Sequence, residues 1–147
     1  MLRFLLACLV MIPVSVARAE IIDIENAEAA TLSASGIAVI DVRTAPEWEE
    51  TGVIPGSRLL TFFDERGNAD PKAWLEKVKG FSKPTDPLIV ICRSGKRSKA
   101  VSQFLSEQAG YAKVYNVKHG ISSWIKESRP ITPAAPVLAS CRQAKTC

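Results

Sequence analysis

The sequence predicts an α/β fold in which a mostly parallel sheet of about five strands carries helices on both faces. Short apolar stretches alternate along the chain with segments of helical periodicity, which is typical of a parallel sheet. The stretch Leu88–Ile91 consists of four branched apolar residues, the pattern of a strand buried on both faces. Because such sheets bind ligands beyond the carboxyl ends of their strands, we expect a functional site at that edge.

The first half of the chain supplies three of the expected strands and three helices. Apolar residues define the strands at residues 21–24, 38–42 and 57–62. The first helix is alanine-rich, the second has a proline in its first turn, where proline is tolerated, and the third is amphipathic. These helices are expected at residues 25–35, 45–50 and 71–78.

The second half supplies the remaining two strands and two helices. After strand 88–91 and a short loop, apolar residues recur at helical spacing as far as Ala109, with Ser98 as the expected N-cap. A strand at residues 113–117 and a helix at 120–126 complete the predicted fold.

Cys92 lies directly after the buried strand, on a turn that leads into a helix. The thiolate is the reactive form of cysteine, and nearby cations and a helix N-terminus both stabilise it. No acid appears between Asp86 and Glu107, and the cations that follow Cys92 are Arg93, Lys96, Arg97 and Lys99. We therefore expect Cys92 to be a nucleophile at the base of an anion-binding loop. That loop consists of Arg93, Ser94, Gly95, Lys96, Arg97 and Ser98.

The alternative is that Cys92 is an inert buried thiol, since free cysteine is among the most buried residue types. The surroundings disfavour it, because an inert thiol requires apolar neighbours whereas cations require solvent or an anion. A glycine and a small serine also allow the turn to close tightly around the sulfur.

Three motifs resemble the rhodanese (thiosulfate sulfurtransferase) family. Residues 92–98, CRSGKRS, are similar to the family loop C-R-S-G-x-R-S. Residues 41–57 contain D-V-R, an acidic-aromatic pair and G-V-I-P-G-S, similar to the family's D-V-R and G-H-I-x-G-A. Residues 116–124, NVKHGISSW, are similar to N-V-x-G-G-I-x-x-W. Together the motifs indicate one domain at residues 20–129.

The resemblance implies a rhodanese-like fold and a sulfurtransferase that works through a persulfide on Cys92. A small anionic donor such as thiosulfate would supply the sulfur, and a thiophilic acceptor, either cyanide or a thiol, would take it without a cofactor. Loop length favours sulfur transfer, because the arginine falls at C-x4-R whereas related phosphatases use the wider C-x5-R. The resemblance also implies a supporting role for Asp41 and Arg43, which organise neighbouring loops in the family.

Two positions depart from the family pattern. Val53 replaces a histidine that is not the family's nucleophile, and His119 replaces a glycine. A Cys–His hydrolase would need its histidine held by a third group, so we assign His119 no catalytic role. With one histidine and no paired-cysteine motif, no metal site is expected either.

Residues 1–19 have the pattern of a secretory signal peptide, with a charged start, an apolar run and an A-x-A site that predicts cleavage after Ala19. The run is shorter than the ~20 residues of a membrane anchor, and lipoprotein cleavage at Cys8 would leave too short an apolar region. We expect a periplasmic protein without a stable membrane anchor.

Charge excludes nucleic acid as a partner. The formal net charge is +4, and it would fall to +2 after cleavage because Arg3 and Arg18 are lost with the signal. No aromatic residues interleave with the basic positions to form a stacking platform. The positive charge is concentrated around Cys92, which favours a small anion.

Residues 130–147 are rich in proline and alanine, and we expect an extended tail whose removal costs little stability. In an oxidising compartment, Cys141 and Cys147 form a possible disulfide that leaves Cys92 free. Alternatively, a tail cysteine attacks a sulfur-loaded Cys92. Two other functions therefore stay open: a thiol–disulfide redox protein that uses the tail cysteines, and a sulfur carrier or binding module.

Overall fold

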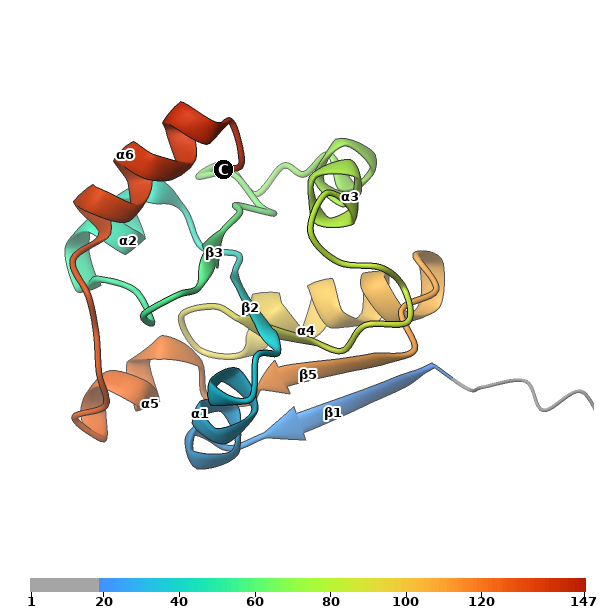
Figure 1. Cartoon of the computed structure of the whole chain (residues 1–147), viewed down its shortest axis with the longest axis horizontal. Coiled ribbons are helices and arrows are strands. Elements are labelled where there is room, and N and C mark those ends of the chain that lie inside the picture. Colours follow the sequence, from blue (N-terminus) through green and yellow to red (C-terminus); the bar gives the residue numbers. More distant parts are fainter. Residues whose placement is uncertain (1–18) are drawn as a thin grey trace, which may run out of the picture.

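A five-stranded sheet organises the computed structural model, which describes residues 19–147. The predicted signal peptide covers residues 1–19, of which residues 1–18 lie outside the described part. The strand order is β1-β5-β4-β2-β3 and every neighbouring pair is parallel (Figure 1). The strands are β1 (Glu20–Ile24), β2 (Ala38–Asp41), β3 (Arg58–Leu59), β4 (Leu88–Ile91) and β5 (Lys113–Val117). The predicted α/β class and parallel sheet are thus confirmed.

Helices cover both faces of this sheet, as predicted. They are α1 (Asn26–Ala34), α2 (Ala45–Thr51), α3 (Pro71–Lys79), α4 (Lys96–Gln103), α5 (Gly120–Lys126) and α6 (Ala134–Ala144), with a π-helical turn, η1 (Phe104–Gln108), directly after α4. Helices α3 and α4 contribute to the core on one face, and α1 and α5 to the core on the other. Within residues 19–147, no helix is long and apolar enough to cross a membrane.

Strand β4 forms the centre of the fold. Its four residues are fully buried, because alternate side chains enter the two cores. Leu88 and Val90 face α3 and α4, whereas Ile89 and Ile91 face α1 and α5. The uninterrupted apolar run follows from this placement, since neither side of β4 faces solvent.

Strand β3 is shorter than the expected strand at residues 57–62. Only Arg58 and Leu59 pair regularly with β2. The chain beyond them follows β2 through two further hydrogen bonds, Leu60 N–H to the Asp41 carbonyl (3.0 Å) and Phe62 N–H to the Val42 carbonyl (3.3 Å). The apolar residues therefore continue into the core after the regular ladder has ended.

The prediction of an extended tail at residues 130–147 is wrong, because α6 occupies most of it. Thr132 pairs with Val53 through two backbone hydrogen bonds of 2.9 Å and brings the chain back to the domain. Helix α6 then packs against α2 and β3 (Figure 1). The apolar stripe consists of only two buried residues, Ala134 and Leu138, four positions apart. Pro136 lies in the first turn, where the missing N–H has no helical partner.

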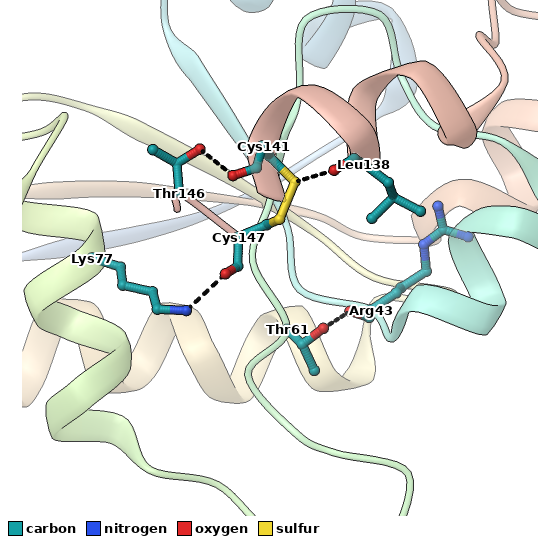
Figure 2. The surroundings of a disulfide bond; sticks show 7 residues. All are labelled: Arg43, Thr61, Lys77, Leu138, Cys141, Thr146 and Cys147. Carbon is teal, nitrogen blue, oxygen red and sulfur yellow. Dashed lines mark hydrogen bonds between the residues drawn. A yellow bond between two sulfur atoms is a disulfide. The ribbon is translucent and has the colours of Figure 1, made fainter. Parts of the chain in front are cut away.

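A disulfide closes the end of the tail. Cys141 and Cys147 are bonded with their Cα atoms 5.4 Å apart, and Figure 2 shows that the bridge joins the last turn of α6 to the chain end. The Cys147 carbonyl accepts a hydrogen bond of 2.9 Å from Lys77 Nζ of α3. Cys92 is the free cysteine among residues 19–147.

Candidate active site

The candidate nucleophile, Cys92, lies one residue beyond β4, at the carboxyl edge of the sheet. The residue is 1 % exposed, and its Sγ accepts a hydrogen bond from Gly95 N–H at 3.2 Å. Ser98 Oγ lies 3.3 Å from the same sulfur. The loop therefore turns back over the sulfur and aims one backbone donor and one hydroxyl at it.

Gly95 makes this turn possible and caps α4. Its φ of +90° lies in the left-handed region, and a Cβ at this position would collide with the backbone carbonyl oxygen of Lys118. The prediction of Ser98 as N-cap is wrong, because Gly95 occupies that position and Ser98 lies inside the first turn. The Ser98 side chain is thereby free to face the sulfur.

The start of α5 is hydrogen-bonded to the backbone of Cys92 and of the loop. Ile121 N–H donates to the Cys92 carbonyl at 2.8 Å, and Ser122 N–H donates to the Arg93 carbonyl at 3.1 Å. Gly120 allows this close approach, since a Cβ there would meet the carbonyls of both loop residues. His119, by contrast, has a φ of −109°, a backbone conformation that any residue can adopt. A histidine can therefore replace the first glycine of the family's G-G pair at this position.

Most of the cations that follow Cys92 in the sequence are paired with acids. Arg97 forms a two-pronged ion pair with Glu47 of α2, at 2.6 and 2.8 Å. Arg93 lies 3.7 Å from Glu50, and Lys99 lies 2.9 Å from Asp23. Within residues 19–147 no acid pairs with Lys96, which is exposed. Lys96 is thus the loop cation that remains available to an incoming anion.

The contact between Glu47 and Arg97 shifts the pKa values of both side chains. Partial burial alone would raise the pKa of Glu47, but hydrogen bonds from Arg97 and Thr44 outweigh it and lower the pKa to about 2. The same pair raises the pKa of Arg97 above its ordinary value. Both side chains therefore stay charged across the neutral range, and Arg97 is fixed in place.

Asp41 and Arg43 lie at the end of β2, beside Cys92. The guanidinium binds both carboxylate oxygens, with a shortest distance of 2.7 Å, and both residues are buried. Arg43 also donates to Thr51 Oγ1 at 2.7 Å and to the Gly52 carbonyl at 2.9 Å. The pair thus joins the end of β2 to the end of α2, the helix that carries Glu47.

Sequence reasoning missed three polar residues that the structure brings to the site. Glu47 was identified as part of a motif but not as the partner of Arg97, although the spacing of Thr44 and Glu47 is that of a capping box. Asn116 and Asp23 were also missed. Asn116 Oδ1 accepts from Ser98 Oγ at 2.6 Å, and Asn116 Nδ2 donates to Asp23 Oδ1 at 2.8 Å.

Two other features lie apart from the sulfur. His119 is exposed, and its Nε2 lies 3.8 Å from Glu25 Oε2. A cavity of about 300 Å³ opens at the start of α2, and no residue of the 92–98 loop lines it. Its walls are Thr44, Ala45, Pro46, Thr61, Asp64, Glu65 and Arg66. Neither feature includes a residue of the 92–98 loop.

Comparison with known proteins places this geometry in a family. The model of the rhodanese-like domain matches residues 25–127, a range that contains β4, the Cys92 loop and the start of α5. The chain belongs to the rhodanese-like family. This membership agrees with the resemblance seen in the three motifs, and α6 lies beyond the matched range as an addition to the family domain.

Relatives of this rhodanese-like chain include named sulfurtransferases. It is 32% identical over 117 residues to thiosulfate sulfurtransferase 18 of Arabidopsis thaliana, across 76% of this chain and 84% of the relative. It is 45% identical over 49 residues to thiosulfate sulfurtransferase GlpE of Actinobacillus pleuropneumoniae serotype 3, across 33% of this chain and 44% of the relative. The chain is therefore a member of a sulfurtransferase family.

Solved structures share the rhodanese-like fold. A rhodanese-related protein from Thermoplasma volcanium is 31% identical, with a TM-score of 0.56 and coverage of 76% of this chain and 97% of that one. A rhodanese-like domain protein from Staphylococcus aureus has a TM-score of 0.57 at 23% identity, covering 76% of this chain and 98% of that one.

Proposed function

We propose that this protein transfers a sulfane sulfur from thiosulfate, or a similar small anionic donor, to a thiophilic acceptor. The observation that carries the proposal is the position of Cys92 after the buried strand β4, with Gly95 N–H donating to its sulfur and the Ser98 hydroxyl 3.3 Å away, within reach of the sulfur when the thiolate forms. Donors arranged in this way stabilise negative charge as it develops on sulfur.

In the proposed first step, the Cys92 thiolate attacks the outer sulfur of thiosulfate. A new S–S bond forms, the bond between the two thiosulfate sulfurs breaks, and its electron pair leaves with sulfite. The product is a persulfide anion on Cys92. In the second step cyanide or a thiolate attacks the terminal sulfur, which releases thiocyanate or a new persulfide and regenerates the Cys92 thiolate.

The loop cations have separate tasks in this scheme. Lys96, exposed at the start of α4, attracts the sulfonate end of the donor. Arg97 is held by Glu47 and supplies a fixed positive charge near the sulfur. The first backbone N–H groups of α4 lack helical partners and add partial positive charge.

The test is transfer from thiosulfate to cyanide by the Cys92→Ser variant. We expect turnover to be abolished, because a serine hydroxyl cannot form the persulfide. The circular dichroism spectrum should stay that of the parent. Ser140→Ala, an exposed serine on α6 outside the loop, is the control and should keep its activity. Retained turnover in Cys92→Ser would reject the nucleophile.

We also propose that residues 1–19 direct export to the periplasm and are removed after Ala19. The charged start, apolar run and A-x-A site support this, and the Cys141–Cys147 disulfide fits an oxidising compartment. Protein recovered from its native host should begin at Glu20 and fractionate with soluble exported proteins. A lipid-modified start at Cys8, or an intact Met1, would overturn this proposal.

A further inference from the structure

The Ser98 hydroxyl has more acceptors around it than it has protons. Its Oγ lies 2.6 Å from Asn116 Oδ1, 3.1 Å from the Gly95 carbonyl and 3.3 Å from Cys92 Sγ. The Gly95 carbonyl already accepts Lys99 N–H at 3.1 Å. Because a hydroxyl donates a single proton, Asn116 Oδ1, the Gly95 carbonyl and the Cys92 sulfur compete for it, and Asn116 Oδ1 is the nearest of the three.

The orientation of the Asn116 amide decides this competition. Sheet register places Asp23 of β1 opposite Asn116 of β5, and Asn116 Nδ2 donates to Asp23 Oδ1 at 2.8 Å. A carboxylate can only accept, so it holds the amide nitrogen toward β1 and the amide oxygen toward Ser98. The Asn116 amide, and after it the Lys99 ammonium, lower the pKa of Asp23. Asp23 therefore remains an acceptor at neutral pH.

We propose that Asp23 and Asn116 are positioning residues that turn the Ser98 hydroxyl proton away from Cys92 and thereby favour the resting thiol over the thiolate. The inference rests on the proposed role of Cys92 as the reactive group. In the resting state the Cys92 S–H donates to Ser98 Oγ, and Ser98 donates to Asn116. When Cys92 loses its proton to solvent, Ser98 must rotate toward the sulfur. Asn116 Oδ1, in a residue that is 3 % exposed, then loses its donor.

Other charges also act on this thiol, and the experiment must separate them from the hydrogen-bond chain. Arg97 interacts with Cys92 through space and with Asp41. The charged residues on the elements around the loop are Glu20 and Asp23 of β1, Glu25 after it, Asp41 of β2 and Arg43 after it, Glu47, Glu49 and Glu50 of α2, Arg93 of the loop, Lys96, Arg97 and Lys99 of α4, Lys113 of β5, Lys118 and His119 before α5, and Lys126 of α5. A charge-neutral substitution is therefore the cleanest probe.

The decisive variant is Asn116→Leu, which removes the competing oxygen without changing charge. The rate of Cys92 alkylation by iodoacetamide is measured against pH on the full chain, with Ser98→Ala and Asn116→Leu/Ser98→Ala alongside. We expect the midpoint of the Asn116→Leu profile to move ~0.5–1 pH unit lower, the range that one net hydrogen bond supplies. The double variant should coincide with Ser98→Ala, because the chain acts through that hydroxyl.

A second variant keeps the proposal testable if leucine disrupts β5. Asp23→Asn should also lower the midpoint, and that shift should vanish in the Ser98→Ala background. An unchanged or raised midpoint would overturn the proposal. A lowered midpoint that persists in the Ser98→Ala background would also overturn it, because Asp23 would then act by its charge and not through the hydroxyl. Alkylation needs no sulfur donor, so the result is independent of turnover. A shifted profile without thiosulfate activity would reject the proposed function alone.

Discussion

Glu47 and Arg97, fifty positions apart in the sequence, form an ion pair in which the two terminal guanidinium nitrogens bind the carboxylate, at 2.6 and 2.8 Å. The pair joins the start of α2 to the start of α4 and fixes one cation beside the Cys92 sulfur. Glu47 also closes the capping box of its own helix with Thr44. One carboxylate thus supports both the fold and the site.

This pair predicts a specific dependence of stability on pH. The folded-state pKa of Glu47, about 2, lies below its ordinary value of 4.5. The stabilisation is therefore present above about pH 4.5 and is lost as the pH falls toward about 2. Across that range, urea unfolding should show a shallower fall in the free energy of unfolding for Glu47→Gln than for the parent. Glu49→Gln, exposed on the same helix, should follow the parent, and parallel curves for all three proteins would contradict the prediction.

Lys96→Ala should weaken the use of thiosulfate. Because Lys96 is exposed, its attraction for the donor is modest, and we expect KM for thiosulfate to rise ~2–5-fold with a smaller change in kcat. The difference should shrink as salt is added, since screening removes the attraction. The matched control is Lys126→Ala, an exposed lysine on α5. Equal KM values in the two variants would exclude a role for Lys96 in donor binding.

Leu138→Ala should destabilise the whole domain. Leu138 is 3 % exposed and packs in a cluster with Trp48, Val53 and Leu59. We expect a loss of ~2–5 kcal/mol in the free energy of unfolding, the usual range for removing a buried leucine side chain. Ser140→Ala, exposed on the same helix, should change it little. Equal midpoints in urea would mean that α6 does not contribute to the folded core.

The Cys141→Ser/Cys147→Ser variant should lose stability but retain sulfur transfer. Opening so short a covalent loop costs about 2 kcal/mol by the chain-entropy estimate. Transfer rates should match the parent with cyanide and also with glutathione as acceptor, because the two cysteines are bonded to each other. A selective loss with glutathione would instead make the tail part of the mechanism and favour the redox alternative.

Local patterns explain why the sheet and the position of Cys92 at its carboxyl edge were predictable. The run Leu88–Ile91 is apolar because both of its faces are covered, and the turn chemistry around Gly95 is compressed into a few adjacent residues. Such features depend on residues that are adjacent in the sequence, so a short sequence pattern is enough to predict them. The contacts of Asp41 with Arg43 are local in the same sense.

Features set by tertiary contacts were not predictable in this way. Asn116 and Ser98 meet only because β5 lies beside β4, and no pattern within either segment records the meeting. Helix α6 was missed because its buried stripe is reduced to Ala134 and Leu138, too few residues for a periodic signal. Packing against α2 and β3 stabilises this helix, which at 11 residues would be marginal in isolation.

The position of α6 has a consequence for how copies of this protein behave toward one another. Strand β3 is an edge of the sheet, and an uncovered edge presents unpaired backbone groups that can recruit a strand from another molecule. Here the edge strand is only two residues long and α6 packs against it. The opposite edge, β1, carries Glu20 and Asp23. A short strand, a helix packed beside it and charged residues all oppose edge-to-edge aggregation. We therefore expect a chain without α6 to aggregate faster at high concentration than the parent.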